Sequence, residues 1–133
     1  MIATLKREAI VYGVGALKGA ARGDRMIWAL HRAALMNGIV PVAPALVVAE
    51  GFRTEARGDR LEMLLAGARI EELDYVQARE VGELASRIDA SDLVSMDVVR
   101  TAERRNAAVV SERQPALKTA SDLLGHDLVM YAV

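Results

Sequence analysis

The chain contains no cysteine, few aromatic residues and no long apolar run. The absence of cysteine excludes disulfide bonds, thiolate metal sites and cysteine nucleophiles. Phe, Tyr and Trp make up only 4% of the 133 residues, so the core has to be built from aliphatic side chains and methionine. The longest apolar stretch, residues 39–49, contains two prolines and is too short to span a bilayer.

The chain also lacks an excess of either positive or negative charge, because its formal net charge is −1. This balance does not by itself require a polyanionic partner. Residues 1–8 lack the apolar run of a signal peptide. Hydrophobic residues make up 53% of the chain, enough to bury a real core. We therefore expect one domain over residues 1–133, located in the cytoplasm and not in a membrane.

Apolar runs of strand length alternate with segments of helical period, a pattern that predicts a parallel α/β sheet. A short helix or turn is expected after the first strand, as far as Ala21. The predicted strands cover residues 9–14, 39–42, 68–73, 107–111 and 128–131. The predicted helices cover residues 25–36, 44–52, 60–65, 75–88, 93–105 and 115–125.

Polar residues mark the ends of these predicted helices. Asp24, Asp59, Asp74 and Asp92 each stand where a carboxylate can accept from the first free backbone N–H groups of a helix. Asn106 stands where a left-handed residue ends one. Residues expected to face the core are Ile27, Leu30, Ala34 and Leu35 in the first long helix, and Val76, Val81 and Leu84 in a later one.

The carboxyl end of the first predicted strand lacks the carboxylate that an α/β site would place there. This edge of a parallel sheet is a favoured position for ligands and metals. The chain reads Tyr12-Gly13-Val14-Gly15-Ala16 at that point. The glycines are interpreted as close packing between a strand and a helix, because no acid follows at the end of the second strand to contact a ribose.

Five segments, in order and spacing, resemble those of a PIN domain, and the likeness is closest to VapC-type toxin ribonucleases of actinobacteria. The resemblance covers nearly the whole chain. It implies a PIN-like three-layer α/β sandwich, with a mostly parallel central sheet flanked by helices. The segments are residues 11–17, 21–25, 44–53, 91–99 and 107–111.

The resemblance also implies a function. Proteins of that family are metal-dependent endoribonucleases and act as the toxins of toxin–antitoxin systems. A Mg²⁺ or Mn²⁺ ion held by several carboxylates would activate water and neutralise charge on a phosphodiester. An antitoxin protein, single-stranded or structured RNA and a second copy of the chain are the implied partners.

Only part of the implied metal site is present in this sequence. Glu50 and Asp92 fall on acidic positions of the family and are the implied catalytic and metal-binding residues. Three other acidic positions hold Gly13, Ser95 and Arg113. The resemblance therefore implies a degenerate site, in which Gly13→Asp would be the natural first step towards restoring a metal.

Two neighbouring acids are the possible replacements. Glu112 lies one position before Arg113 and is a third candidate metal ligand. Asp97 lies two positions from Ser95 on a predicted helix. Because successive helical residues are rotated by about 100°, Asp97 is expected to point away from the site.

Three functions remain open from the sequence. The first is a VapC-like protein whose catalysis is weak or lost, which would need no cofactor. The second is an active ribonuclease that holds Mg²⁺ or Mn²⁺ with Glu50, Asp92 and Glu112. The third is a non-catalytic module that binds RNA or protein in the former groove, with Arg53 and Arg113 as nucleic-acid-binding residues and Arg22 beside them.

Overall fold

The computed structural model describes residues 9–55, 58–88, 92–112, 114–125 and 129–132. Within these ranges the chain alternates strands and helices, as its apolar pattern predicts. The strands are β1 (Ile10–Tyr12), β2 (Val42–Pro44), β3 (Arg69–Glu71), β4 (Ala108–Ser111) and β5 (Met130–Ala132). The helices are α1 (Val14–Ala21), α2 (Arg25–Met36), α3 (Ala45–Thr54), α4 (Asp59–Ala66), α5 (Tyr75–Arg87), α6 (Leu93–Arg105) and α7 (Pro115–Leu123).

The strands form one parallel sheet in the order β3-β2-β1-β4-β5. Val11 of the central strand pairs with Val42 on one side and Val109 on the other. The residues of β1 and β4 are fully or almost fully buried, as apolar strands covered on both faces should be. Since every strand runs the same way, the residues after β1 and after β4 meet at one edge of the sheet.

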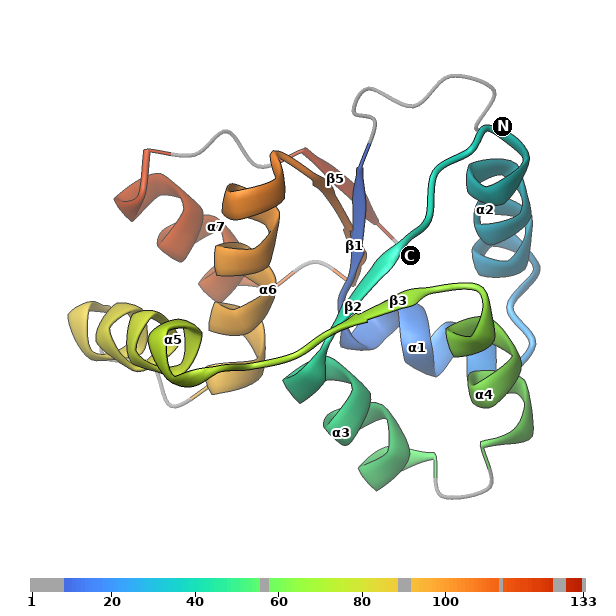
Figure 1. Ribbon diagram of the computed structural model, residues 1–133, viewed down its shortest axis with the longest axis horizontal. Coiled ribbons are helices and arrows are strands. Elements are labelled where there is room, and N and C mark those ends of the chain that lie inside the picture. The colour runs from blue at the N-terminus through green and yellow to red at the C-terminus, as the bar shows by residue number, and fades with distance from the viewer. Residues whose placement is uncertain (1–8, 56–57, 89–91, 113, 126–128, 133) are drawn as a thin grey trace.

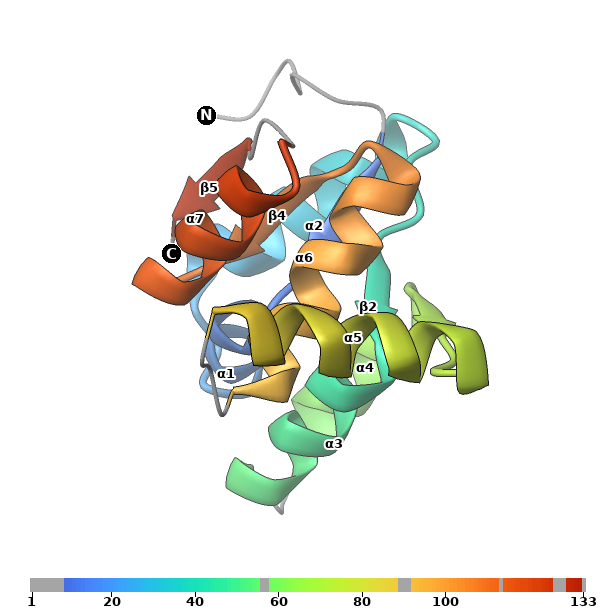
Figure 2. The same cartoon turned by 90° about the vertical axis from the view of Figure 1, so that its left-hand side faces the viewer.

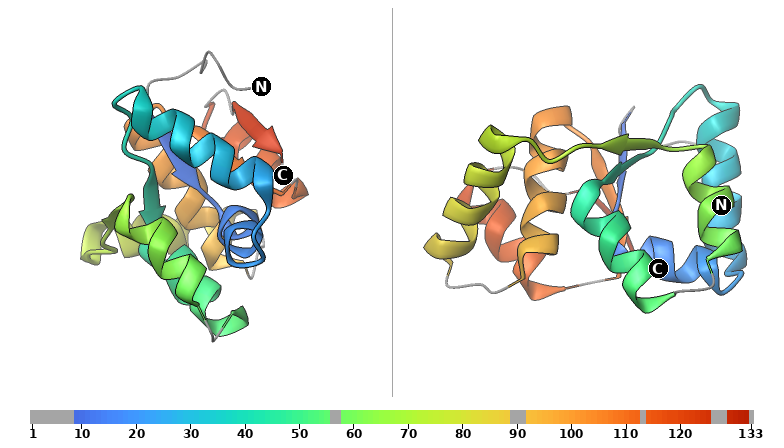
Figure 3. Two further views of the ribbon diagram at one scale, coloured as in Figure 1. Left: turned by 90° about the vertical axis from the view of Figure 1, so that its right-hand side faces the viewer. Right: turned by 60° about the horizontal axis from the view of Figure 1, so that its bottom comes forward.

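Helices cover both faces of this sheet. Figure 1 shows α5, α6 and α7 on one side, and α1, α2 and α4 on the other. Figure 2 looks onto the α5, α6 and α7 layer, and the left view of Figure 3 onto the opposite one. The predicted three-layer α/β sandwich is thus confirmed. No helix in the described part of the chain is long and apolar enough to cross a membrane.

The predictions made from local capping residues are mostly confirmed. The bounds of α2 and α6 agree with those expected. Asp24 accepts from the backbone of α2, and Asp74 forms a capping box with Gln77 at the start of α5. Asn106 ends α6 with a φ of 50°. Asp59 is different, because it is the first residue of α4 and Gly58 takes the cap position without a side-chain bond.

The second strand and two buried faces differ from the prediction. β2 begins at Val42, so Pro41 precedes the strand and contributes only its carbonyl, which accepts from Arg69 N at 2.8 Å. Pro44 ends β2 and stands before α3, where its missing N–H costs nothing. Leu35 is 41% exposed and Val76 is 64% exposed, so neither is part of the buried face of its helix.

A buried polar contact joins β1 to α2. The Tyr12 hydroxyl lies 2.7 Å from Nδ1 of His31, and Trp28 packs edge-on against the imidazole. Both Tyr12 and His31 are almost completely buried. Nδ1 of the neutral ring accepts from the hydroxyl, so this histidine has a structural partner. Burial lowers the pKa of His31 below its ordinary value.

We expect this histidine to make the protein less stable in mild acid. The unfolded chain takes up the proton at a higher pH than the folded one does, so stability is complete above the ordinary histidine pKa. It falls as the pH drops below that value. Urea unfolding of the wild type between pH 7 and pH 5 should show this loss, and His31→Gln should reduce it. An equal pH dependence in both proteins would contradict the assignment.

Candidate functional site

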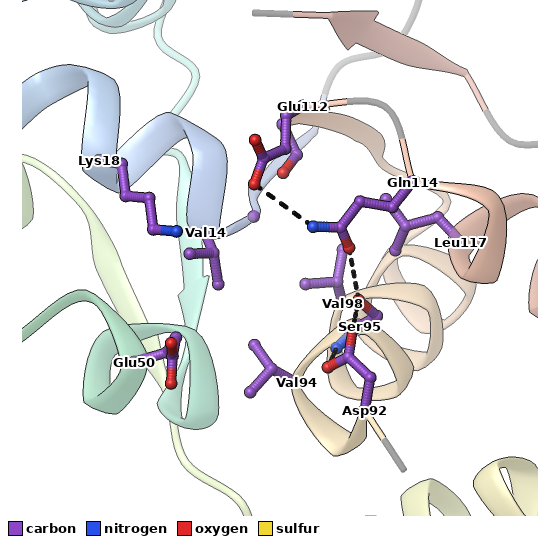
Figure 4. A pocket seen from close by; sticks show the side chains of 12 residues that line it. Val14, Lys18, Glu50, Asp92, Val94, Ser95, Val98, Glu112, Gln114 and Leu117 are labelled. Atoms are coloured by element: carbon purple, nitrogen blue, oxygen red, sulfur yellow. Dashed lines mark hydrogen bonds between the residues drawn. The ribbon is translucent and has the colours of Figure 1, made fainter. Parts of the chain in front are cut away.

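A cavity of about 220 Å³ opens at the edge of the sheet where β1 and β4 end. Figure 4 shows side chains from α1, α3, α6 and the segment after β4 turned towards it. The cavity therefore lies where parallel α/β sheets usually bind ligands. Its lining consists of Gly13, Val14, Lys18, Glu50, Asp92, Val94, Ser95, Val98, Ser111, Glu112, Gln114 and Leu117.

The end of β1 offers no room for a side chain at Gly13. Gly13 N donates to Val110 O at 2.9 Å, which holds the two strand ends together. A Cβ on Gly13 would lie 2.4 Å from Oγ and 2.6 Å from Cβ of Ser111. Ser111 is itself buried, and its Oγ accepts from Gly15 N at 3.3 Å. The Ser111 side chain thus occupies the space that a side chain on Gly13 would need.

A chain of hydrogen-bonded side chains joins the start of α6 to the start of α7. Asp92 caps α6 by accepting from Ser95 N at 3.0 Å, and the Ser95 hydroxyl forms a short contact with the same carboxylate. The Gln114 amide contacts Ser95 Oγ at 2.8 Å, and its Nε2 donates to Glu112 at 3.4 Å. Hydrogen bonds therefore connect Asp92 to Glu112 across one wall of the cavity.

Glu50 projects into the cavity from α3 and is paired with an arginine on its own helix. Arg53 Nε donates to Glu50 Oε1 at 2.8 Å, and a second, short contact joins the two groups. This hydrogen bond lowers the pKa of Glu50, and the charges of Arg53 and Lys18 lower it further. Glu50 is therefore a carboxylate already balanced by neighbouring cations.

The structure brings most, but not all, of the predicted residues together. Glu50, Asp92 and Glu112 line the cavity, as do Gly13 and Ser95. Arg53 reaches the site only through Glu50. Asp97 lies elsewhere, buried against the start of α3, as its helical position predicts. Arg113 lies outside the described residues.

Sequence reasoning missed three polar residues of the lining. They are Ser111, Gln114 and Lys18, which all line the cavity. Lys18 lies one helical turn after Val14 in α1, so both residues share the face of this helix that lines the cavity. Ser111 and Gln114 lie directly before and after Glu112 and Arg113, the two positions that the sequence analysis singled out.

The residues present do not fit a Mg²⁺ or Mn²⁺ site of the family type. In the ranges that the structure describes, no group of three or more His, Cys, Asp or Glu side chains is arranged to hold a metal ion. Hard divalent cations need several oxygen ligands in close, strict geometry. Glu50 is engaged by Arg53 and Asp92 by Ser95, so both carboxylates would have to exchange these partners for the ion.

A second cavity of about 350 Å³ adjoins the first along α1. The two cavities share Lys18 and Glu112. The second one also contains Arg22, which pairs with Glu55 at 3.1 Å. Arg22 was expected to line the same groove as Arg53, but it belongs to this neighbouring cavity.

Comparison with known proteins finds likeness at the level of structure. No protein-family model matches the chain, and no curated protein matches it. A chain of VapBC2 from Rickettsia felis, solved bound to a DNA fragment from its promoter, superposes with a TM-score of 0.70 at 13% identity. The match covers 94% of this chain and 98% of that one.

PAE2754 from Pyrobaculum aerophilum superposes with a TM-score of 0.59 at 16% identity, covering 98% of this chain and 87% of the other. Two proteins this distant in sequence share with it the arrangement of helices and strands. The chain has the fold of VapBC2's matching chain, the PIN-like α/β sandwich that its sequence predicts.

Proposed function

We propose that this protein is a VapC-like PIN-domain protein, derived from a Mg²⁺-dependent endoribonuclease, in which metal-dependent catalysis is weak or lost. The single observation that carries the proposal is the state of the cavity at the sheet edge. Glu50 and Asp92 remain there, while Ser111 fills the space beside Gly13 and hydrogen bonds engage Ser95.

The fold supports a role within a toxin–antitoxin pair. The similar chain from Rickettsia felis comes from a VapBC2 structure bound to promoter DNA. By analogy, an antitoxin protein is the proposed partner of this chain, a second copy is the proposed neighbour in a dimer, and the cytoplasm is the proposed location. Actinobacterial ancestry stays a prediction from the sequence segments.

A non-catalytic module that binds RNA is the second candidate. It is favoured by Lys18 and Arg22, which line the two adjoining cavities one helical turn apart. Cations in this position would contact phosphates, so binding should weaken steeply with added salt. An active ribonuclease built on Glu50, Asp92 and Glu112 is disfavoured, because the described residues contain no group of three such side chains arranged to hold a metal ion.

A cleavage assay tests the main proposal. The purified protein is incubated with single-stranded and structured RNA in millimolar Mg²⁺ or Mn²⁺, beside Glu50→Ala and the exposed-site control Glu62→Ala. We expect all three proteins to show the same background level of RNA cleavage, because removing a carboxylate from a site that does not hold a catalytic metal leaves the cleavage rate unchanged. Multiple-turnover metal-dependent cleavage that Glu50→Ala abolishes and Glu62→Ala retains would refute the proposal.

A further inference from the structure

Lys18 stands at the boundary between the two cavities and lines both. It is one of only three lysines in the chain. Figure 4 shows its side chain extending from α1 with the ammonium turned towards the space between Glu50 and Glu112. Among the described residues it has no ion pair within salt-bridge distance, so its charge faces the cavity instead of a single partner.

Three carboxylates surround the same space. Glu50 comes from α3, Asp92 from the start of α6 and Glu112 from the segment after β4. Glu50 is influenced by Lys18, since the positive charge of the lysine favours its ionised form. An ammonium carries three donors on a flexible stem, so it can serve carboxylates on both sides of a cavity in turn.

We propose that the Lys18 ammonium is the resident cation of this cavity, and that it keeps divalent cations away from Glu50 and Glu112. This inference rests on the proposed function, because it explains how a site with remaining carboxylates dispenses with a metal. A tethered charge competes without loss of translational entropy, whereas a dissolved cation has to be captured and partly dehydrated. The two positive charges would also repel each other.

A change of one side chain tests the inference. Lys18→Met removes the charge while retaining an unbranched side chain that suits a helix. Arg22→Met is the matched control, since Arg22 lies one turn further along α1 and lines only the second cavity. We expect Mn²⁺, followed by the electron paramagnetic resonance signal of the free ion, to bind Lys18→Met about tenfold more tightly than wild type or Arg22→Met.

Zero-length cross-linking measures the position of the ammonium independently. A carbodiimide activates a carboxylate, and a neighbouring lysine then forms an amide with it. We expect mass spectrometry to find Lys18 joined to Glu50 or Glu112. The exposed pair Lys118 and Asp122, 3.0 Å apart, is the internal control in the same sample.

The outcomes separate this inference from the proposed function. If Lys18→Met binds Mn²⁺ no better than Arg22→Met does, or if only Lys118 forms its cross-link, the resident-cation inference is wrong. If wild-type protein cleaves RNA with a metal over multiple turnovers, the proposed function is wrong. In that case a gain of Mn²⁺ affinity in Lys18→Met would still support the role of the lysine.

Discussion

Gly13→Asp is expected to lower the free energy of unfolding by about 3 kcal/mol or more, and not to create a metal site. The new Cβ would overlap both side-chain atoms of Ser111, and Cβ of that serine cannot move without its strand. β4 is held between β1 and β5, so the strand has little freedom to shift. The new carboxylate would also be buried beside Ser111, whose hydroxyl can donate only one hydrogen bond to it.

A second substitution, at Ser111, shows whether Gly13→Asp destabilises the protein through steric overlap or through the burial of a carboxylate. In Gly13→Asp/Ser111→Gly the obstructing side chain is gone, so the double variant should be more stable than Gly13→Asp in urea unfolding, despite the cost of glycine in a strand. Gly82→Asp is the matched control, since nothing lies within 4 Å of a Cβ at that exposed helical position. Stability within about 0.5 kcal/mol of wild type for Gly13→Asp itself would contradict the argument.

The same position shows how far the sequence could lead. The gap at Gly13, the retained acids and their meeting at one sheet edge all followed from the order of apolar runs and a family resemblance. The obstacle to an acid at this position is Ser111, which is almost a hundred residues away in the sequence. Only the register of β1 against β4 brings the two together.

Local signals were more reliable than those that depend on tertiary packing. Asp24 and Asp92 cap helices through contacts with residues two or three positions along, which spacing alone determines. The exposure of Leu35 and Val76 depended on which neighbouring elements cover α2 and α5, and periodicity does not contain that information. The direction of the Lys18 side chain likewise depends on tertiary packing, because it is set by how α1 packs against α3.

Asp97→Ala is expected to destabilise the protein by about 2 kcal/mol, although Asp97 is not part of the cavity. Pro44 provides no side-chain cap for α3, and Asp97 of α6 accepts from Leu46 N at 3.4 Å in its place. Thr101 Oγ1 lies 3.5 Å from the other carboxylate oxygen. Alanine would remove the side-chain acceptor from the half-buried Leu46 N–H and from the buried Thr101 hydroxyl, and would loosen the helix that carries Glu50.

Asp97→Asn isolates the contribution of charge. Its side-chain oxygen can still accept from Leu46, while burial raises the pKa of the natural carboxyl above its ordinary value. A raised pKa means that the folded state holds the proton to a higher pH than the unfolded state, so ionisation costs stability as the pH rises above the ordinary aspartate pKa. The stability of Asp97→Asn relative to wild type should therefore increase from pH 4 to pH 7 in urea unfolding. If Asp97→Asn instead becomes relatively weaker at pH 7, the negative charge at the start of α3 stabilises the fold, and the helix N-terminus outweighs burial.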